Sequence, residues 1–256
     1  MAEFVRAETS GHVGVITIAR PKRRNALNLQ VKQDIVEQLA AMASDDAVAV
    51  IVLTGDGGTF VAGTDIAEMA TMGPSDHLRL DTDRVFHAVR QSPKPVIAAV
   101  EGYALGGGCE LALACDMIVA ADDAIFGQPE IRVGIMPGAG GTQRLLRAAG
   151  RYKTLLWSLT GEMIPARDAL AANLVSELVP KGQALSRSLQ IAEQIAAMPP
   201  LSVQAIREAV RLGADVPLET ALALERRLFE RLFDTRDQKE GMRAFLEKRA
   251  PNYTGA

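Results

Sequence analysis

Residues 95–116 read PVIAAVEGYALGGGCELALACD, and this stretch decides how the fold is interpreted. Its first part, residues 96–100, is apolar on both faces, which is typical of a strand in a sheet covered on both sides. The glycine triplet 106–108 then leads into a short apolar helix that extends to about Cys115. A buried strand followed by a helix favours an α/β fold.

Working outward from this stretch, the same alternation continues. Strands are predicted at 14–18 and 49–54, and a helix between them is capped by Asn28, with an apolar stripe of Val31, Ile35, Leu39 and Met42. Three more strands are predicted at 117–121, 124–126 and 174–179. Helices are then expected at 183–197, 201–212, 217–233 and 235–248. Because Pro199-Pro200 cannot sit inside a helix, we expect an α/β core at 1–198 and an α-helical region at 199–256.

The charge balance limits the classes of partner. With 28 Lys and Arg against 31 Asp and Glu, the net charge is −3, which argues against nucleic acid and anionic membrane as principal partners. No stretch approaches the roughly 20 apolar residues of a membrane span. The first apolar run, 13–18, is shorter than the core of a signal peptide, so we expect a cytoplasmic protein.

Several common catalytic sites are not supported by the sequence. It has no G-x-S-x-G motif, and its three histidines lie near no metal-ligand pattern, so no metal is expected. Cys109 and Cys115 fit neither a disulfide framework nor a zinc site. The glycine clusters at 102–108 and 134–142 match neither the dinucleotide fingerprint nor the phosphate loop with its lysine.

The glycine triplet 106–108 indicates a backbone that turns unusually or is approached closely by another group. The helix that follows presents free N–H groups and the positive end of its dipole, which suits an oxyanion such as a thioester enolate. A tight turn from strand to helix would explain the triplet equally well.

Two carboxylates stand beside apolar residues. Glu110 lies in CELALAC, and Glu130 follows 20 residues later in FGQPEI. Turn residues Asp116 and Asp122-Asp123 would allow the chain to go out and return, so that the two carboxylates could meet. Sharing one low-dielectric pocket would leave one of them protonated and the other ionised near neutral pH, which is the requirement for acid–base catalysis without a metal. The alternative is that each is a separate, partly exposed charge.

Long motifs identify a family at this point. The segments RPKRRNALN, TFVAGTDIAEM, PVIAAVEGYALGGGCELALACD, FGQPEIRVGIMPGAGGTQRL and FLEKRAPNY, in this order, resemble the enoyl-CoA hydratase/isomerase (crotonase) family over nearly the whole chain. The resemblance implies a spiral α/β core of repeated ββα units and an α-helical C-terminal region that helps to form trimers. It also implies hexamers built as dimers of trimers.

The resemblance also implies a set of site residues. The backbone N–H groups of Thr64 and Gly107 would form the oxyanion hole, although relatives often carry alanine at the first of these positions. Glu110 and Glu130 would be the two catalytic acids, and Gly138 would help to place the catalytic water. The implied coenzyme A contacts are Ala26, Ala62, Asp65 and Ile66 along the channel, Arg24 near the nucleotide, and Lys248 reaching a phosphate from a neighbouring subunit.

The expected activity is the reversible syn hydration of a trans-2-enoyl-CoA to a 3-hydroxyacyl-CoA in fatty acid or related acyl-CoA metabolism. Coenzyme A enters as part of the substrate, so no separate cofactor is expected. A double-bond isomerase and a specialised dehydratase of the same family are the nearest alternatives. An acyl-CoA-binding or RNA-binding scaffold without catalysis is the alternative from another class, and the presence of both glutamates disfavours it.

Overall fold

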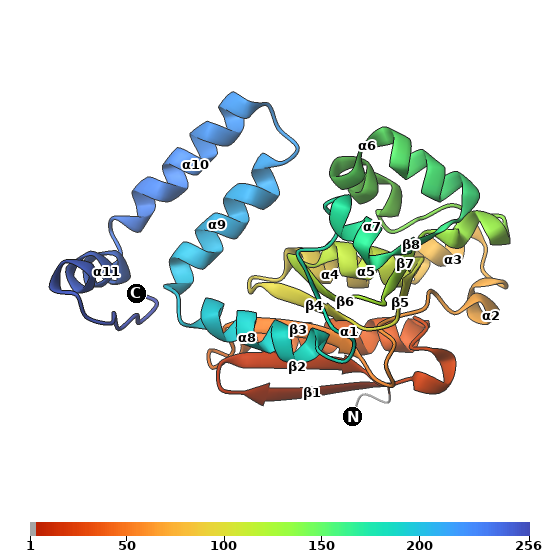
Figure 1. Ribbon diagram of the computed structural model, residues 1–256, viewed down its shortest axis with the longest axis horizontal. Coiled ribbons are helices and arrows are strands. Elements are labelled where there is room, and N and C mark those ends of the chain that lie inside the picture. The colour runs from red at the N-terminus through yellow and green to blue at the C-terminus, as the bar shows by residue number, and fades with distance from the viewer. Residues whose placement is uncertain (1–3) are drawn as a thin grey trace.

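A computed structural model describes residues 4–256 and contains two sheets surrounded by helices (Figure 1). The strands are β1 (Val5–Ser10), β2 (Val13–Ile18), β3 (Val50–Gly55), β4 (Val96–Val100), β5 (Tyr103–Leu105), β6 (Met117–Ala121), β7 (Ile125–Gly127), β8 (Met163–Pro165) and β9 (Glu177–Val179). The α-helices are α1 (Leu29–Ser44), α2 (Ile66–Met69), α3 (Pro74–Arg79), α4 (Arg84–Gln91), α5 (Gly107–Ala114), α6 (Gly141–Thr160), α7 (Ala166–Ala171), α8 (Ala184–Ala196), α9 (Pro200–Gly213), α10 (Leu218–Leu232) and α11 (Arg236–Glu247), with 3₁₀ turns η1 (Pro21–Arg23) and η2 (Pro129–Val133).

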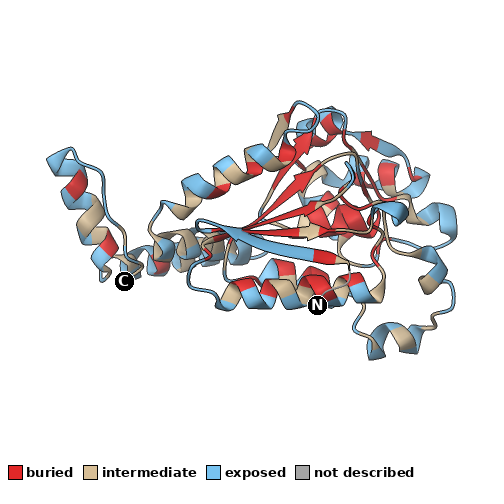
Figure 2. Cartoon of the chain, turned by 90° about the horizontal axis from the view of Figure 1, so that it is seen from below, coloured by how far each residue is buried: buried red, intermediate tan, exposed pale blue. Residues whose placement is uncertain are grey.

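The larger sheet has the strand order β1-β2-β3-β4-β6-β9 and is parallel except for the β1–β2 hairpin. Alternate side chains of its strands enter two separate apolar layers. Val50 and Val52 of β3 face α8, whereas Ile51 and Leu53 face the layer that contains α1, α4 and α5. Figure 2 shows that the buried residues are concentrated in these strands. The sheet is therefore covered on both faces, as predicted for residues 96–100.

The smaller sheet, β5-β7-β8, brings together two segments that carry the candidate acids. β5 pairs in parallel with β7, in a register that places Leu105 opposite Gly127. The Gly106 N–H continues this pairing by donating to the Gly127 carbonyl at 2.9 Å. Because α5 follows β5 and η2 follows β7, the segments that leave the paired ends of the two strands lie next to one another.

Most predicted elements agree with the structure within one residue at each end, whereas the short elements β5, β8 and α7 were not predicted, and there are three further differences. The strand predicted at 174–179 is shorter and consists of Glu177–Val179. The strand Val5–Ser10 was not predicted, because it is an edge strand whose last five residues are exposed and therefore shows no buried pattern. Helix α6 was not predicted either, since it has no side-chain N-cap and is kinked where Gly150 adopts φ 75°.

Helices α9–α11 extend away from the sheets (Figure 1). Pro200 begins α9, so the predicted break in helical structure at this point is confirmed, while the division into two domains at residue 198 stays a prediction. Large apolar side chains are exposed on these helices. The most exposed are Val210 (69%), Leu218 (70%), Phe245 (84%) and Leu246 (80%).

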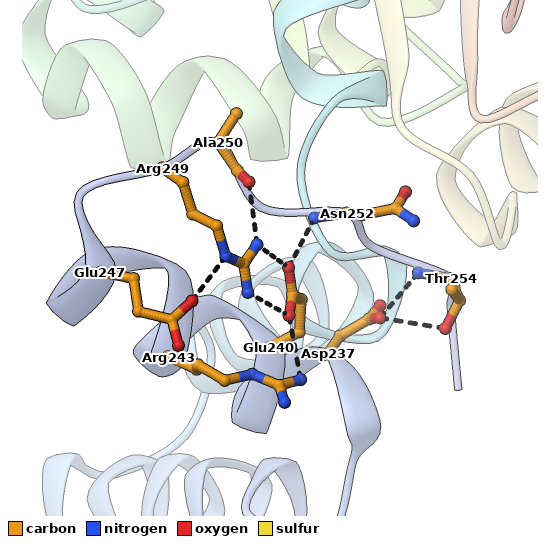
Figure 3. A network of polar contacts seen from close by, with 8 residues as sticks. All are labelled: Asp237, Glu240, Arg243, Glu247, Arg249, Ala250, Asn252 and Thr254. Atoms are coloured by element: carbon orange, nitrogen blue, oxygen red, sulfur yellow. Dashed lines mark hydrogen bonds and ion pairs between the residues drawn. The ribbon is translucent and has the colours of Figure 1, made fainter.

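The C-terminal tail folds back onto α11 through a polar network (Figure 3). Two Arg249 nitrogens donate to the Glu240 carboxylate at 2.6 and 2.9 Å, and the Asn252 N–H donates to the same carboxylate at 3.0 Å. The Thr254 N–H donates to Asp237 at 2.7 Å. The bonds to Glu240, led by those from Arg249, lower the pKa of Glu240 to about 2, so this carboxylate is ionised at neutral pH.

Candidate active site

Glu110 is held in the first turn of α5, immediately after the glycine triplet. Gly106 adopts φ 50° and ψ −124°, a conformation that an L side chain rarely takes, and this allows the chain to pass abruptly from β5 into the helix. A side chain at Gly108 would collide with the Val61 carbonyl. The triplet therefore serves both a turn and a close backbone approach, and the Glu110 side chain that follows is only 3% exposed.

Two backbone amides at the start of α6 hold the Glu110 carboxylate. The N–H groups of Ala139 and Gly141 both donate to Glu110 Oε1, at 2.7 and 2.8 Å. Burial raises the pKa of Glu110, but these two hydrogen bonds and the positive charges of Arg144 and Lys32 act in the opposite direction. The net shift of the Glu110 pKa is upward, and these contacts limit it, so Glu110 is a buried acid whose hydrogen bonds and neighbouring cations favour its ionised form.

Glu130 lies in η2 and has a different environment. Burial, followed by the nearby Glu110 carboxylate, raises the pKa of Glu130 from 4.5 to about 7. Its Oε1 lies over Gly106, where an added Cβ would approach it to 3.1 Å. With its amide nitrogen facing the carboxylate, the fully buried Gln128 donates to both Glu130 oxygens, at 2.9 and 3.1 Å. Glu130 can therefore hold a proton near neutral pH, whereas the two backbone donors to Glu110 favour the ionised form of that carboxylate.

The amides of Thr64 and Gly107 face one space at the start of α5. An added Cβ on Gly107 would lie 3.7 Å from the Thr64 nitrogen and 2.5 Å from Thr64 Oγ1. Among the residues that the structure describes, neither N–H donates to an acceptor. At Thr64 this is because the hydrogen bonds of the Leu27–Thr64 bridge are made by the Gly63 carbonyl and the Asp65 N–H. The pair is arranged as two free donors at a helix N-terminus, which suits a developing oxyanion.

One cleft of about 850 Å³ contains these groups. Glu110 and Glu130 both line it, together with Thr64, Gly107 and Gly138. Its lining also includes the apolar side chains of Met69, Met72 and Phe86. The structure therefore brings the two carboxylates, whose meeting the sequence left open, into one shared cleft.

The implied coenzyme A residues lie in several places. Ala62 and Ile66 line the cleft, but Arg24, Ala26 and Asp65 do not. The Asp65 carboxylate is bound to Arg20 at 2.8 Å, the Ala26 carbonyl also accepts from Arg20, and Arg24 is exposed. Lys248 lies at the end of α11, far from α5 in Figure 1, so it would reach a cleft only on a neighbouring subunit.

Some residues of the site were not predicted from the sequence. Lys32 on α1 lines the cleft, donates to the Thr82 carbonyl at 2.8 Å, and has a pKa lowered by burial. Arg144 donates to the Ala139 carbonyl at 2.8 Å. Backbone donors such as Ala139 have no side-chain pattern, whereas the place of Lys32 one helical turn after Asn28 could have drawn attention to it.

Residues 4–256 contain no cluster of three or more His, Cys, Asp or Glu side chains that could hold a metal ion. No helix in the same part of the chain is long and apolar enough to cross a membrane. Cys109 is buried, and burial raises the pKa of its thiol to about 12, which keeps it protonated.

The fold and the cleft define a protein that offers two amide donors to an oxyanion and two unequal carboxylates for proton transfer. Comparison with known proteins agrees with this class. The family model described as enoyl-CoA hydratase/isomerase matches residues 8–256, and the chain belongs to this family.

Individual relatives cover nearly the whole chain. It is 45% identical over 241 residues to the 2,3-dehydroadipyl-CoA hydratase of Escherichia coli, covering 94% of both chains, and 44% identical over 246 residues to a probable mitochondrial enoyl-CoA hydratase of Dictyostelium discoideum, covering 96% of this chain and 89% of the relative. The crystal structure of an enoyl-CoA hydratase from Bacillus anthracis matches with a TM-score of 0.94 at 37% identity, covering 99% of this chain and all of that one. The predicted family, the crotonase-like α/β fold and the class of enoyl-CoA hydratases are confirmed at this level.

Proposed function

We propose that this chain catalyses the reversible syn addition of water to the 2,3-double bond of a trans-2-enoyl-CoA, giving a 3-hydroxyacyl-CoA. The observation that carries this proposal is the pair of glutamates in one cleft, one supported as an anion and one with a pKa of about 7. Hydration needs both a group that accepts a proton from water and a group that donates one to carbon. This pair can supply both at neutral pH.

Polarisation of the thioester is the first requirement. Conjugation with the carbonyl makes C3 electrophilic, and charge then develops on the thioester oxygen as water adds. The N–H groups of Thr64 and Gly107 are free to bind that oxygen, and the dipole of α5 adds to their effect. Loss of one such donor typically costs about 3 kcal/mol in the barrier.

Proton transfer completes the addition. Ionised Glu110 accepts a proton from the attacking water, with Gly138 in the adjoining wall helping to place that water. Protonated Glu130 delivers a proton to C2. The hydroxyl oxygen of the product comes from the water, and its carbonyl oxygen is that of the thioester. The addition therefore needs no oxidant or reductant.

Coenzyme A acts as a handle whose binding energy positions the acyl chain. Ala62 and Ile66 in the cleft wall support a pantetheine channel on that side. Contacts from Arg24, Ala26 and Asp65, and a phosphate contact from Lys248 of a neighbouring subunit, stay predictions of the family resemblance. We expect no cofactor beyond the substrate itself.

A trimer, or a hexamer made of two trimers, is the expected assembly. The exposed apolar side chains on α9–α11 support it, because large apolar surfaces of this kind usually mark an interface. A cytoplasmic location remains our expectation. An isomerase acting on the double bond of a trans-3-enoyl-CoA is the nearest alternative, and the family description names isomerases beside hydratases.

The test is the loss of enoyl-thioester absorbance when the purified protein meets crotonyl-CoA. We expect rapid loss with the wild type and a decrease of kcat by orders of magnitude in both Glu110→Gln and Glu130→Gln. Glu8→Gln, an exposed change on β1, is the matched control and should keep full activity. Conversion of trans-3-enoyl-CoA without any hydration of crotonyl-CoA would favour the isomerase instead.

A further inference from the structure

A second cavity, of 380 Å³, adjoins the catalytic cleft. It lies between α4, the start of α6 and the connection from α9 to α10. Four residues line both spaces: Asp83, Phe86, Gly138 and Ala139. The two cavities therefore adjoin one another along Phe86 and the loop that carries Ala139.

The charges in this second cavity are unbalanced. Its lining contains four arginines, Arg90, Arg144, Arg147 and Arg211, against Asp83 and Asp215, which leaves an excess of two positive charges.

The two carboxylates already have partners. Asp215 pairs with Arg147 at 2.5 Å, and Asp83 contacts His87, which also lines the cavity, at 3.1 Å. Within residues 4–256, no carboxylate lies within 4.0 Å of the guanidinium nitrogens of Arg90, Arg144 or Arg211. Three cations thus line one cavity without a direct counter-ion in the described chain.

Arg144 connects this cavity with the catalytic acid through one residue. Its Nη1 donates to the Ala139 carbonyl at 2.8 Å, while the Ala139 N–H donates to Glu110 at 2.7 Å. A path from the oxyanion hole therefore passes Gly107, Glu110 and Ala139 before it reaches Arg144. Along this path, the cavity lies on the side of Glu110 that faces away from the oxyanion hole.

The titration of Arg144 agrees with a shortage of negative charge. Burial lowers the pKa of Arg144 and the neighbouring positive charge of Arg90 lowers it further, while the Glu110 carboxylate acts in the opposite direction. A bound anion would relieve both effects, because it would replace lost solvation and separate two like charges. Planar guanidinium groups also match carboxylates in a bidentate geometry.

From this arrangement we propose that the arginine-lined cavity binds a carboxylate at the far end of the acyl chain, so that the substrate class is an enoyl-CoA with a terminal carboxylate. This inference rests on the proposed hydration and adds to it the end group of the substrate. Arg90 and Arg144 bind the carboxylate, Phe86 contacts the methylene groups that lead to it, and Glu110 and Glu130 act on the double bond.

The experiment compares matched substrates. Initial rates of hydration are measured for trans-2-enoyl-CoA thioesters of six, eight and ten carbons that end either in a methyl group or in a carboxylate. For at least one chain length, we expect kcat/KM to be roughly tenfold or more higher for the carboxylate form, since charge-assisted hydrogen bonds of this kind are worth that much. In Arg90→Gln, this ratio should decrease by a similar factor.

Arg84→Gln is the matched control. Arg84 is an exposed arginine on the same helix, α4, that does not line the cavity, so its removal should leave the substrate ratio unchanged. Absence of a preference for the carboxylate form at every length would overturn the inference. An unchanged ratio in Arg90→Gln would overturn it as well. Hydration of the methyl-ended substrates would still stand in both cases, whereas failure of every substrate would overturn the proposed function too.

Two further measurements test other occupants. Inorganic phosphate and glutarate are each titrated against the thermal midpoint of wild type and Arg90→Gln. Stabilisation of the wild type alone, without any substrate preference, would assign the cavity to a free anion and overturn the acyl-chain assignment. A smaller assembly of Arg90→Gln in analytical ultracentrifugation would show that an acidic side chain of a second copy fills the cavity, with the same consequence.

Discussion

The side-chain amide of Gln128 donates to both carboxylate oxygens of Glu130, although the two residues are only two positions apart. Gln128 is fully buried, and its amide packs so closely against Gly141 that a Cβ there would lie 2.5 Å from the amide atom that faces away from Glu130, which is the oxygen in this orientation. The proton donor is therefore oriented by a side chain that is itself fixed by the start of α6. Predictions about the chemistry of Glu130 follow from this orientation.

Activity in the hydration direction should decrease as the pH rises through about 7. Glu130 must be protonated to deliver a proton to C2, and its raised pKa of about 7 means that the active form is lost above that pH. The measurement is kcat/KM for crotonyl-CoA between pH 5 and pH 9. A profile that stays flat up to pH 9 would remove Glu130 from the role of acid.

Replacing Gln128 by Leu should move the alkaline limb of the pH profile, where kcat/KM decreases, to higher pH. The amide donors stabilise the carboxylate anion, so their loss raises the pKa of Glu130 further. We expect kcat to decrease about tenfold because the carboxylate also loses its orientation. Gln128→Glu is less informative, since it adds a charge. If kcat decreased while the limb remained in place, Gln128 would support packing only.

Glu130→Gln should be more stable than the wild type at alkaline pH. An acid whose pKa rises on folding favours the folded state when protonated, and this contribution is lost as the pH rises from about 4.5 to about 7. At pH 8 the variant should gain about 2 kcal/mol, after allowance for the solvent contact of this half-buried group. Thermal midpoints at pH 8 and pH 4 measure the difference, which should vanish at pH 4. An equal gain at both values would indicate a cause other than ionisation.

The oxyanion hole depends on the backbone at two positions that respond differently to substitution. Gly107→Ala should lower kcat about 100-fold, because its new methyl group would lie 3.7 Å from the Thr64 nitrogen, inside the space for the thioester oxygen. Thr64→Ala keeps its N–H and should remain within about threefold of the wild type. Steady-state kinetics of both variants and of the double variant check this, and the double variant should stay as slow as Gly107→Ala. Recovery in the double variant would place the defect in the contact with Thr64 Oγ1.

Lys32→Met should move the acid limb of the profile to higher pH. The Lys32 charge lowers the pKa of Glu110, so its removal allows Glu110 to bind a proton more readily. Lys32→Arg keeps the charge and is the matched control, with its limb expected at the wild-type position. The same kcat/KM profile detects the shift, and identical limbs in the two variants would show that the charge does not reach Glu110.

The sequence was sufficient where the determining interactions are local. Continuous apolar runs predicted β3 and β4, and helical spacing predicted α1, because each pattern lies within a single element. Glu110 was a good candidate because its neighbours along the helix are apolar. Glu130 was recognisable from the glycine and proline that precede it, Gly127 and Pro129.

The geometry of the site required contacts between distant segments. The register of Leu105 with Gly127 joins two strands of three residues each, which are too short to show a periodic pattern. The Ala139 and Gly141 donors belong to the backbone, so no side chain indicates them. Helix α6, which begins there, was missed for a related reason, since its Gly140 N-cap provides no side-chain hydrogen bond.

Glu110 also joins two parts of the fold that form separately along the chain. One of its carboxylate oxygens, Oε1, accepts hydrogen bonds from the N–H groups of Ala139 and Gly141, about 30 residues later. These bonds connect α5 to the start of α6. Glu110, our proposed general base, therefore also connects two parts of the fold, and its carboxylate reaches the position seen in the structure only after the later segment has docked. During refolding, enzymatic activity should therefore return only when α6 docks. Its return should be slower than signals that report only on the central strands.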